Sequence, residues 1–213
     1  LQQAQRRGSL QSWSLDLIVN LPDQSLQHWF WELEQAIDQA PPHLSIYDLI
    51  VESGTVFERR QRAGQLPLPG EDAAADRLDA THQALERAGY GHYEISSWAL
   101  PGQASRHNRV YWSGADWWAL GLGSTAGMGG QRLARPRTRQ AYADWVAQQA
   151  GLQCQGSGAG LPPLEDLLLV GLRRREGVDL AWLQQAQLWN ADAAWLQRVL
   201  AGWIERGVVQ LTG

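Results

Sequence analysis

The sequence contains one cysteine, no lysine and no long apolar run. A single thiol excludes an intrachain disulfide, so the cytoplasm is the expected compartment. Without lysine the chain has no side-chain amine for a Schiff base or for acetylation. No stretch is apolar over the length that a membrane-spanning helix needs, and we expect no membrane span.

Positive charge is also scarce, because 18 basic residues face 22 acidic residues and the formal net charge is −4 at pH 7. This balance gives no general attraction to nucleic acid or anionic lipid, and we expect neither as a partner. With 213 residues, 44% of them hydrophobic and 19% charged, the chain can bury one sizeable globular core. Twelve tryptophans are unusual, and they indicate aromatic-rich packing or contact with a flat ligand.

The amino-terminal part has the pattern of a strand, a helix and a second strand. Residues 13–20 alternate between large apolar and mostly polar side chains, which places Asp16 on the face opposite the tryptophan and leucines. Ser25 opens a helical pattern that Pro41 and Pro42 end, and residues 43–51 follow as a second strand. This order predicts a right-handed parallel unit.

The middle of the chain is predicted to contain a long helix and two further strands. Residues 71–88 form an amphipathic pattern that stops at Gly89. We expect one strand from Tyr90 to Trp98 and a strand-like segment from Asp116 to Gly123. Glycines between 121 and 130 predict turns around a hairpin.

Between those two segments, residues 105–112 read Ser-Arg-His-Asn-Arg-Val-Tyr-Trp. We expect a loop on a rigid sheet, where binding residues are common. Imidazole can ligate a metal, guanidinium can bind carboxylates, and aromatic rings can stack on a flat macrocycle. A structural interpretation is the alternative: His107 and Asn108 cap a turn, while Tyr111 and Trp112 fill the core.

The pattern His107-Asn108-x-x-Tyr111-Trp112 resembles the His-Asn-x-x-Tyr-Trp signature of the heme chaperone family HemW. That family belongs to the radical SAM proteins and is close to oxygen-independent coproporphyrinogen III oxidase. Further segments agree in the family's order across nearly the whole chain. They are Leu15-Asp16-Leu17-Ile18 with Leu21-Pro22, Pro41-Pro42-His43-Leu44-Ser45 with Glu52-Ser53-Gly54-Thr55, and Tyr93-Glu94-Ile95-Ser96.

The resemblance implies roles for individual residues. The heme-binding set would be His107, Asn108, Tyr111 and Trp112. Arg106 and Arg109 would face the heme propionates, with pairing to Glu94 as the structural alternative. Asp16 matches an aspartate that contacts S-adenosylmethionine in the family, and a structural aspartate is the alternative. The chain departs from the family just afterwards, because Val19-Asn20 replaces a Tyr-Gly pair.

For the fold, the resemblance implies an α/β protein in which residues 1–150 form later strands of an incomplete radical SAM (β/α) barrel. Residues 151–162 have the composition of a linker and contain Cys154. Residues 163–213 carry three helical patterns and a strand-like run at 208–211. They predict a small, truncated helical domain that resembles a winged helix.

The family holds a [4Fe-4S] cluster on three cysteines, which this chain cannot supply. Because the first residue is also Leu1, we expect a carboxyl-terminal fragment of a longer parent that is not catalytic by itself. The parent would bind heme, S-adenosylmethionine and the cluster, and would pass heme to apoproteins. The alternatives are a coproporphyrinogen III oxidase, which decarboxylates propionates, and a structural remnant without a ligand. Barrel strands left without neighbours predict self-association.

Overall fold

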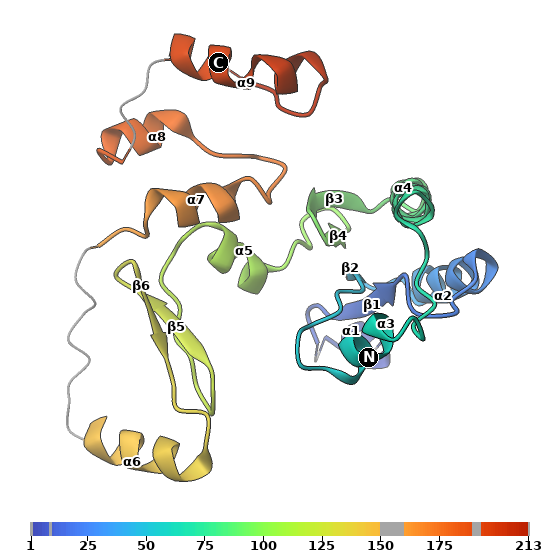
Figure 1. Ribbon diagram of the computed structural model, residues 1–213, viewed down its shortest axis with the longest axis horizontal. Coiled ribbons are helices and arrows are strands. Elements are labelled where there is room, and N and C mark those ends of the chain that lie inside the picture. Colours follow the sequence, from blue (N-terminus) through green and yellow to red (C-terminus); the bar gives the residue numbers. More distant parts are fainter. Residues whose placement is uncertain (1, 9, 150–159, 189–192, 213) are drawn as a thin grey trace.

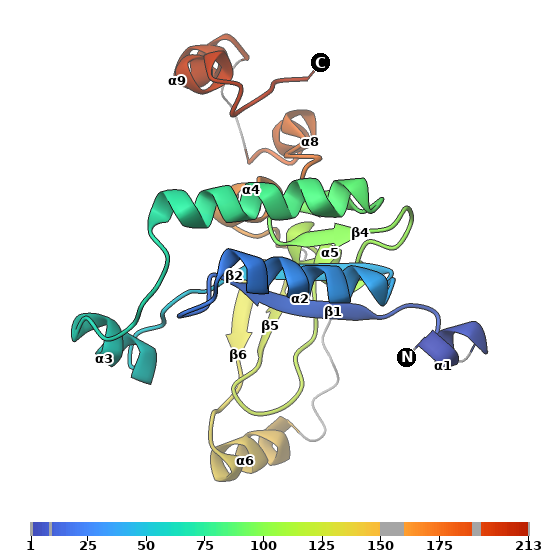
Figure 2. The same cartoon turned by 90° about the vertical axis from the view of Figure 1, so that its right-hand side faces the viewer.

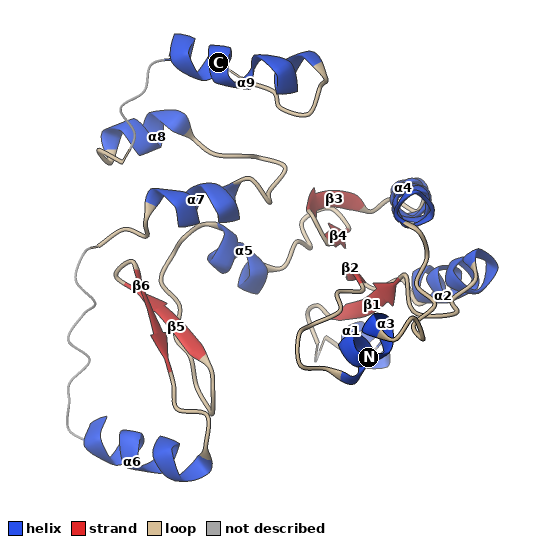
Figure 3. Ribbon diagram, in the orientation of Figure 1, coloured by secondary structure: helices blue, strands red, loops and turns tan. Residues whose placement is uncertain are grey.

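The computed structural model describes residues 2–8, 10–149, 160–188 and 193–212 (Figure 1). After a short helix α1 (Gln2–Arg6), the chain enters the first strand of a four-stranded sheet of order β1-β2-β4-β3. Figure 3 shows the strands in red and the helices in blue, and a second, two-stranded sheet is separate from this one.

The first two strands form the parallel unit that the sequence predicts. β1 (Ser14–Val19) pairs in parallel with β2 (His43–Asp48), and α2 (Leu26–Asp38) connects them. Ser25 caps α2 as expected, because its side chain accepts a hydrogen bond from the backbone N–H of His28 at 3.0 Å.

The predicted strand from Tyr90 to Trp98 is wrong, because the chain turns within it. β3 (Gly91–Glu94) and β4 (Ser97–Ala99) form an antiparallel hairpin, and β4 also pairs antiparallel with β2. In the turn, the Glu94 carboxylate accepts a hydrogen bond from the backbone N–H of Ser96 at 3.2 Å. This side-chain contact supports a tight turn that contains no glycine or proline.

Two helices cover one face of the sheet, α2 and α4 (Glu71–Arg87), and Figure 2 shows them side by side. Trp29 of α2 is fully buried, and its Nε1–H donates to Thr81 of α4 at 2.8 Å. The core cluster is Val19, Trp29, Leu33, Ala36, Leu44, Ile46, Leu85, Tyr90 and Trp98. Since Leu15 and Leu17 pack against this cluster, Asp16 faces the opposite side of the sheet, as the alternation predicts.

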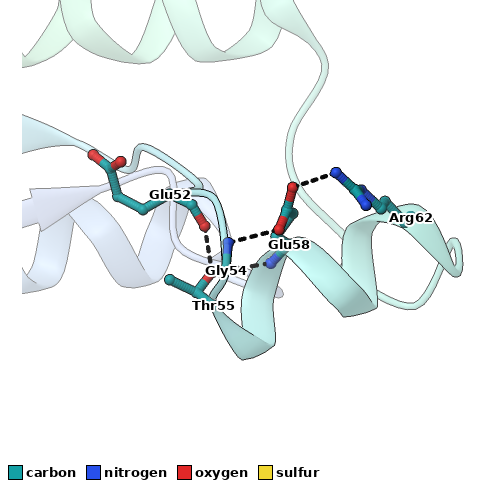
Figure 4. A network of polar contacts seen from close by, with 5 residues as sticks. All are labelled: Glu52, Gly54, Thr55, Glu58 and Arg62. Carbon is teal, nitrogen blue, oxygen red and sulfur yellow. Dashed lines mark hydrogen bonds and ion pairs between the residues drawn. The ribbon is translucent and has the colours of Figure 1, made fainter.

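Between β2 and α4 lies a short helix, α3 (Val56–Arg62), whose start is held by its own side chains (Figure 4). Thr55 accepts a hydrogen bond from the backbone N–H of Glu58 at 3.1 Å, and the Glu58 carboxylate accepts one from Gly54 at 2.7 Å. The same carboxylate pairs with Arg62 at 2.6 Å. Glu52 completes the network through its carbonyl oxygen. In the structure, the segment Glu52-Ser53-Gly54-Thr55 therefore forms the start and the cap of helix α3.

Residues 105–112 do not form the expected loop. They form helix α5 (Arg106–Trp112), capped by Ser105, whose hydroxyl accepts a hydrogen bond from the backbone N–H of Asn108 at 3.2 Å. A serine cap places the following side chains at helical spacing, so residues four apart lie on the same face.

The expected strand-like segment from Asp116 to Gly123 is also wrong, since its only strand pairing with the described residues is an isolated bridge between Trp117 and Gly127. Gly121 and Gly123 have φ of 95° and 66°, which interrupt an extended conformation. The predicted hairpin is present as β5 (Thr125–Met128) and β6 (Gln131–Ala134).

Four helices follow: α6 (Arg139–Gln149), α7 (Leu164–Gly171), α8 (Leu180–Gln185) and α9 (Ala193–Glu205). The last three correspond to the three predicted helical patterns. The strand expected at 208–211 is not formed, because the backbone N–H groups of Val208 and Val209 bond back to Trp203 at the end of α9.

Most of the expected linker, Cys154 included, lies outside the described residues. Within the described part of the chain, no helix is long and apolar enough to cross a membrane.

Candidate functional site

The face of the sheet opposite α2 and α4 lines an open cavity of about 760 Å³. β1 contributes Asp16, and β2 contributes Ser45 and Tyr47. Residues 102–108, which include the first turn of α5, form another wall. Strands and a helix far apart in the sequence therefore place polar and aromatic side chains around one space.

Four of the seven predicted site residues line this cavity: Asp16, Arg106, His107 and Asn108. The other three are Arg109, Tyr111 and Trp112, which lie on α5 but do not line it. The division follows the helix axis, because the motif residues that line the cavity are in the first turn of α5 and the others come later in the helix. The loop predicted from the sequence gives no reason for some residues of the motif to line the cavity and others not to.

The imidazole of His107 is exposed at the cavity. Tyr111 lies one helical turn further on, and the two rings contact edge to face with centroids 4.9 Å apart. Among the residues that the structure describes, none forms a hydrogen bond or ion pair with the ring nitrogens of His107. The ring is thus supported from one side, and its nitrogens are open to a ligand.

The two arginines of the motif have different surroundings. Arg109 forms an ion pair with Glu176 at 2.8 Å, whereas Arg106 lines the cavity and has no ion pair within the described ranges. Neither pairs with Glu94, because the Glu94 carboxylate accepts a hydrogen bond from Arg173 at 3.2 Å. Only Arg106 therefore presents a guanidinium to the cavity.

Trp112 is half-buried and faces the carboxyl-terminal part of the chain. The Arg173 guanidinium lies 4.4 Å from the centre of its ring, a cation–π contact. Tyr111, also half-buried, contacts the ring of Trp117 at 5.1 Å between centroids. In the structure, these two aromatics join α5 to neighbouring segments, and neither belongs to the core cluster that the structural interpretation of the motif expects.

Sequence reasoning missed His43 as a site residue. It is 4% exposed, and its ring nitrogens lie 2.8 Å from the hydroxyls of Ser14 and Tyr93. Burial lowers the pKa of His43, against the opposing effects of Asp16 and Glu94. Burial also raises the pKa of Tyr93. The signal in the sequence was alternation, since every second residue from His43 in β2 has a polar atom and faces the cavity.

The donor atoms near this cavity suit organic ligands better than a metal cluster. Within the described ranges there is no group of three histidine, cysteine or acidic residues that could hold a metal ion. A [4Fe-4S] cluster on three cysteines does not fit a chain with one cysteine. By contrast, the exposed Asp16 carboxylate, with hydroxyl groups around it, fits a ligand that carries amino or hydroxyl donors.

The fold defines the class of protein. Over 97% of this chain and 51% of the other, the structure superposes on coproporphyrinogen III oxidase of Escherichia coli, a radical SAM enzyme, with a TM-score of 0.68 and 20% identity. The fold is therefore an α/β fold like that of about half of this radical SAM enzyme, followed by helices. No family model matches the chain.

Sequence comparison finds relatives of the chain within that class. The chain is 35% identical over 210 residues to the heme chaperone HemW of Synechocystis, covering 97% of this chain and 50% of the relative. It is 36% identical over 183 residues to HemW of Mycobacterium tuberculosis, covering 84% and 46%. The chain is therefore similar to HemW proteins over most of its own length, and it spans about half the length of the curated relatives it matches.

Proposed function

We propose that this chain is part of a heme chaperone in which the imidazole of His107 contacts the heme that is being transferred. The observation that carries the proposal is the exposed His107 ring on the wall of a cavity of about 760 Å³. Neutral imidazole is a common ligand of heme iron. The whole protein would pass its heme to heme-accepting apoproteins in the cytoplasm.

The other motif residues would assist in different ways. Arg106 lines the cavity and has no ion pair with a described residue, so its guanidinium suits a heme propionate. Asn108 lines the same wall, and Tyr111 supports the imidazole ring of His107. Trp112 and Arg109, which contact Arg173 and Glu176, would hold α5 in place.

Asp16 is our candidate contact for S-adenosylmethionine, which would supply radical chemistry in the whole protein. Its carboxylate is exposed at the cavity and could accept hydrogen bonds from the amino or ribose hydroxyl groups of that molecule. This chain cannot hold the [4Fe-4S] cluster, so we expect no catalysis from it alone.

The carboxyl-terminal residues 163–213 would form a small helical domain docked on the sheet domain, residues 1–150. Two contacts support this docking. Arg173 pairs with Glu94, and the backbone N–H of Arg175 donates to the carbonyl of Tyr93 at 3.1 Å. The docked segment thereby extends the edge of the sheet at β3.

Titration with hemin, followed by heme absorbance, tests the heme proposal. We expect saturable binding to the wild-type chain, a shifted absorbance band, and loss of both in H107A. H28A, at an exposed histidine on α2, is the matched control and should bind like the wild type. If the absorbance is unchanged by protein, or the H107A variant binds as well as the wild type, the proposal is wrong.

An oxygen-independent coproporphyrinogen III oxidase is the second candidate, favoured by the structural similarity to that enzyme. The sequence relatives with the higher identities carry the heme chaperone name, so we rank the oxidase second. Decarboxylation of coproporphyrinogen by a protein that contains both this chain and a three-cysteine loop would reverse that order.

A further inference from the structure

A continuous series of hydrogen bonds runs beside the cavity from the start of α5 to β1. The backbone N–H of Ser105 lies 3.3 Å from the Tyr93 hydroxyl, which lies 2.8 Å from Nε2 of His43. Nδ1 of the same ring lies 2.8 Å from the Ser14 hydroxyl, and that hydroxyl lies 3.2 Å from Oδ1 of Asp16. Five residues from four segments of the chain take part.

The Asp16 end of the series decides its direction. At the other end the Tyr93 hydroxyl accepts from the backbone N–H of Ser105, and it can still either donate to His43 or accept from it. An ionised carboxylate can only accept, so the Ser14 hydroxyl donates to Asp16 and accepts from His43. The carbonyl of Leu15, at 3.5 Å, is a longer and uncharged alternative for the Ser14 proton.

The Asp16 end therefore requires that Nδ1 of His43 carries the proton that goes to Ser14. Burial lowers the pKa of His43, which favours the neutral ring. In a neutral ring with a protonated Nδ1, Nε2 accepts from the Tyr93 hydroxyl. One tautomer satisfies all four hydrogen bonds at once.

We propose that His43 is a positioning residue whose Nδ1-protonated ring sets the start of α5, and so His107, in register with Asp16 across the cavity. This inference rests on the proposed function for its ligand, because His107 is the heme contact. It adds a coupling between the two candidate ligand sites, carried by Tyr93 on one side and Ser14 on the other.

The tautomer can be read without any ligand. In a chain labelled with ¹⁵N at its five histidines, long-range ¹H–¹⁵N correlation spectra at pH 7.5 should show His43 with a protonated Nδ1 and an unprotonated Nε2. Loss of that pattern in H43N assigns the signals. An Nε2-protonated or doubly protonated ring would overturn the proposal, whether or not the chain binds heme.

Asp16 sets one end of the series, so its charge should control the tautomer. In D16N the side-chain amide can donate to Ser14 as well as accept, and the requirement for a protonated Nδ1 is removed. We expect the His43 nitrogen signals to move toward a mixture of tautomers. D48N is the matched control, because Asp48 bonds to Asn20 and not to this series. Unchanged His43 signals in D16N would contradict the coupling.

Two substitutions of His43 test its hydrogen bonds to Ser14 and to Tyr93 separately. The amide of asparagine can replace Nδ1 and keep the contact with Ser14, whereas the amide of glutamine can replace Nε2 and keep the contact with Tyr93. We expect H43N and Y93F to weaken hemin binding about ten-fold and H43Q to change it by less than about two-fold. A residue needed only for folding would weaken it equally in H43N and H43Q.

The outcomes distinguish this inference from the proposed function. If the wild type binds no hemin, the heme proposal fails, and the ligand-free spectra still decide the role of His43. If the wild type binds hemin and H43N, H43Q and Y93F bind it equally well, the positioning role fails and the heme proposal stands. S14A removes the contact between His43 and the Asp16 end of the series and should alter the His43 spectra, whereas unchanged His43 spectra in S14A would contradict the coupling.

Discussion

The guanidinium of Arg173 lies 3.2 Å from the carboxylate of Glu94, whose side chain is 2% exposed. The same guanidinium stacks on Trp112. One cation therefore ties the turn of the β3–β4 hairpin, helix α5 and the segment after α7 together.

Removal of this cation should destabilise the fold. R173A leaves the Glu94 carboxylate buried without its ion pair, and we expect the free energy of unfolding to fall by about 2 kcal/mol. Urea denaturation measures it. R109A, which breaks an ion pair that is about half exposed on both sides, is the control and should cost less than about 1 kcal/mol. Equal losses in the two variants would argue against a structural role for the buried pair.

Two fully buried side chains support a second stability prediction. The Nε1–H of Trp29 donates to Thr81 at 2.8 Å, and both residues have 0% exposure. T81V keeps the shape of the side chain but leaves that donor unsatisfied, so we expect a loss of about 1–3 kcal/mol. T125V, at an exposed position on β5, should have little effect. A neutral T81V would mean that the indole finds another acceptor.

The lowered pKa of His43 predicts a pH dependence of stability. Burial holds this pKa below its ordinary value of 6.5 in the folded chain, and burial also lowers the pKa of His92. The unfolded chain therefore binds more protons than the folded chain just below pH 6.5. Stability should be fully present above that pH and should decrease as the pH falls through 6.5 toward the folded pKa values.

Urea unfolding at several pH values between 7.5 and 5 checks this. H43Q removes one of the two titrating groups, and its stability should vary less with pH than that of the wild type. The exposed-site variant H28Q should keep the wild-type dependence. If the stability of the wild type rises as the pH falls, the predicted direction of the pH dependence is wrong.

The parallel β1–α2–β2 unit could be predicted from the sequence because each of its signals is local. Alternating apolar residues, a serine cap and a proline pair all act within one turn or one strand. Asp16 could be assigned to the cavity face for the same reason. Tertiary contacts did not have to be known.

The missed features depend on contacts between distant residues. The turn at 95–96 is supported by Glu94, without the glycine or proline that would mark it. Tyr93 and Ser14 meet His43 from positions 50 and 29 residues away, which no periodicity reveals. Residues 105–112 have the polar and aromatic composition of a loop, and the local signal for the helix they form is the single serine cap.

The different surroundings of the two motif arginines give a functional prediction. Arg106 lines the cavity without an ion pair in the described ranges, so R106A should weaken hemin binding about ten-fold through loss of a propionate contact. R109A should leave hemin affinity close to the wild-type value, because Glu176 already pairs with that side chain. Absorbance titrations of both variants at two salt concentrations provide the comparison. Equal effects of the two substitutions would remove the basis for assigning Arg106 to a propionate.

Self-association is expected from the edge of the sheet. β1 has a partner on one side only among the described strands, so its outer backbone groups are available to another chain. Exposed apolar side chains lie nearby, including Ile18 at 46% and Ile50 at 74%. We expect the weight-average mass by light scattering to rise with protein concentration, and I18K to reduce the rise, because a lysine on an edge strand opposes pairing. I204K on α9, far from β1 in sequence, is the control and should still associate. A wild-type chain that stays monomeric at high concentration would show that this edge is protected within the chain itself.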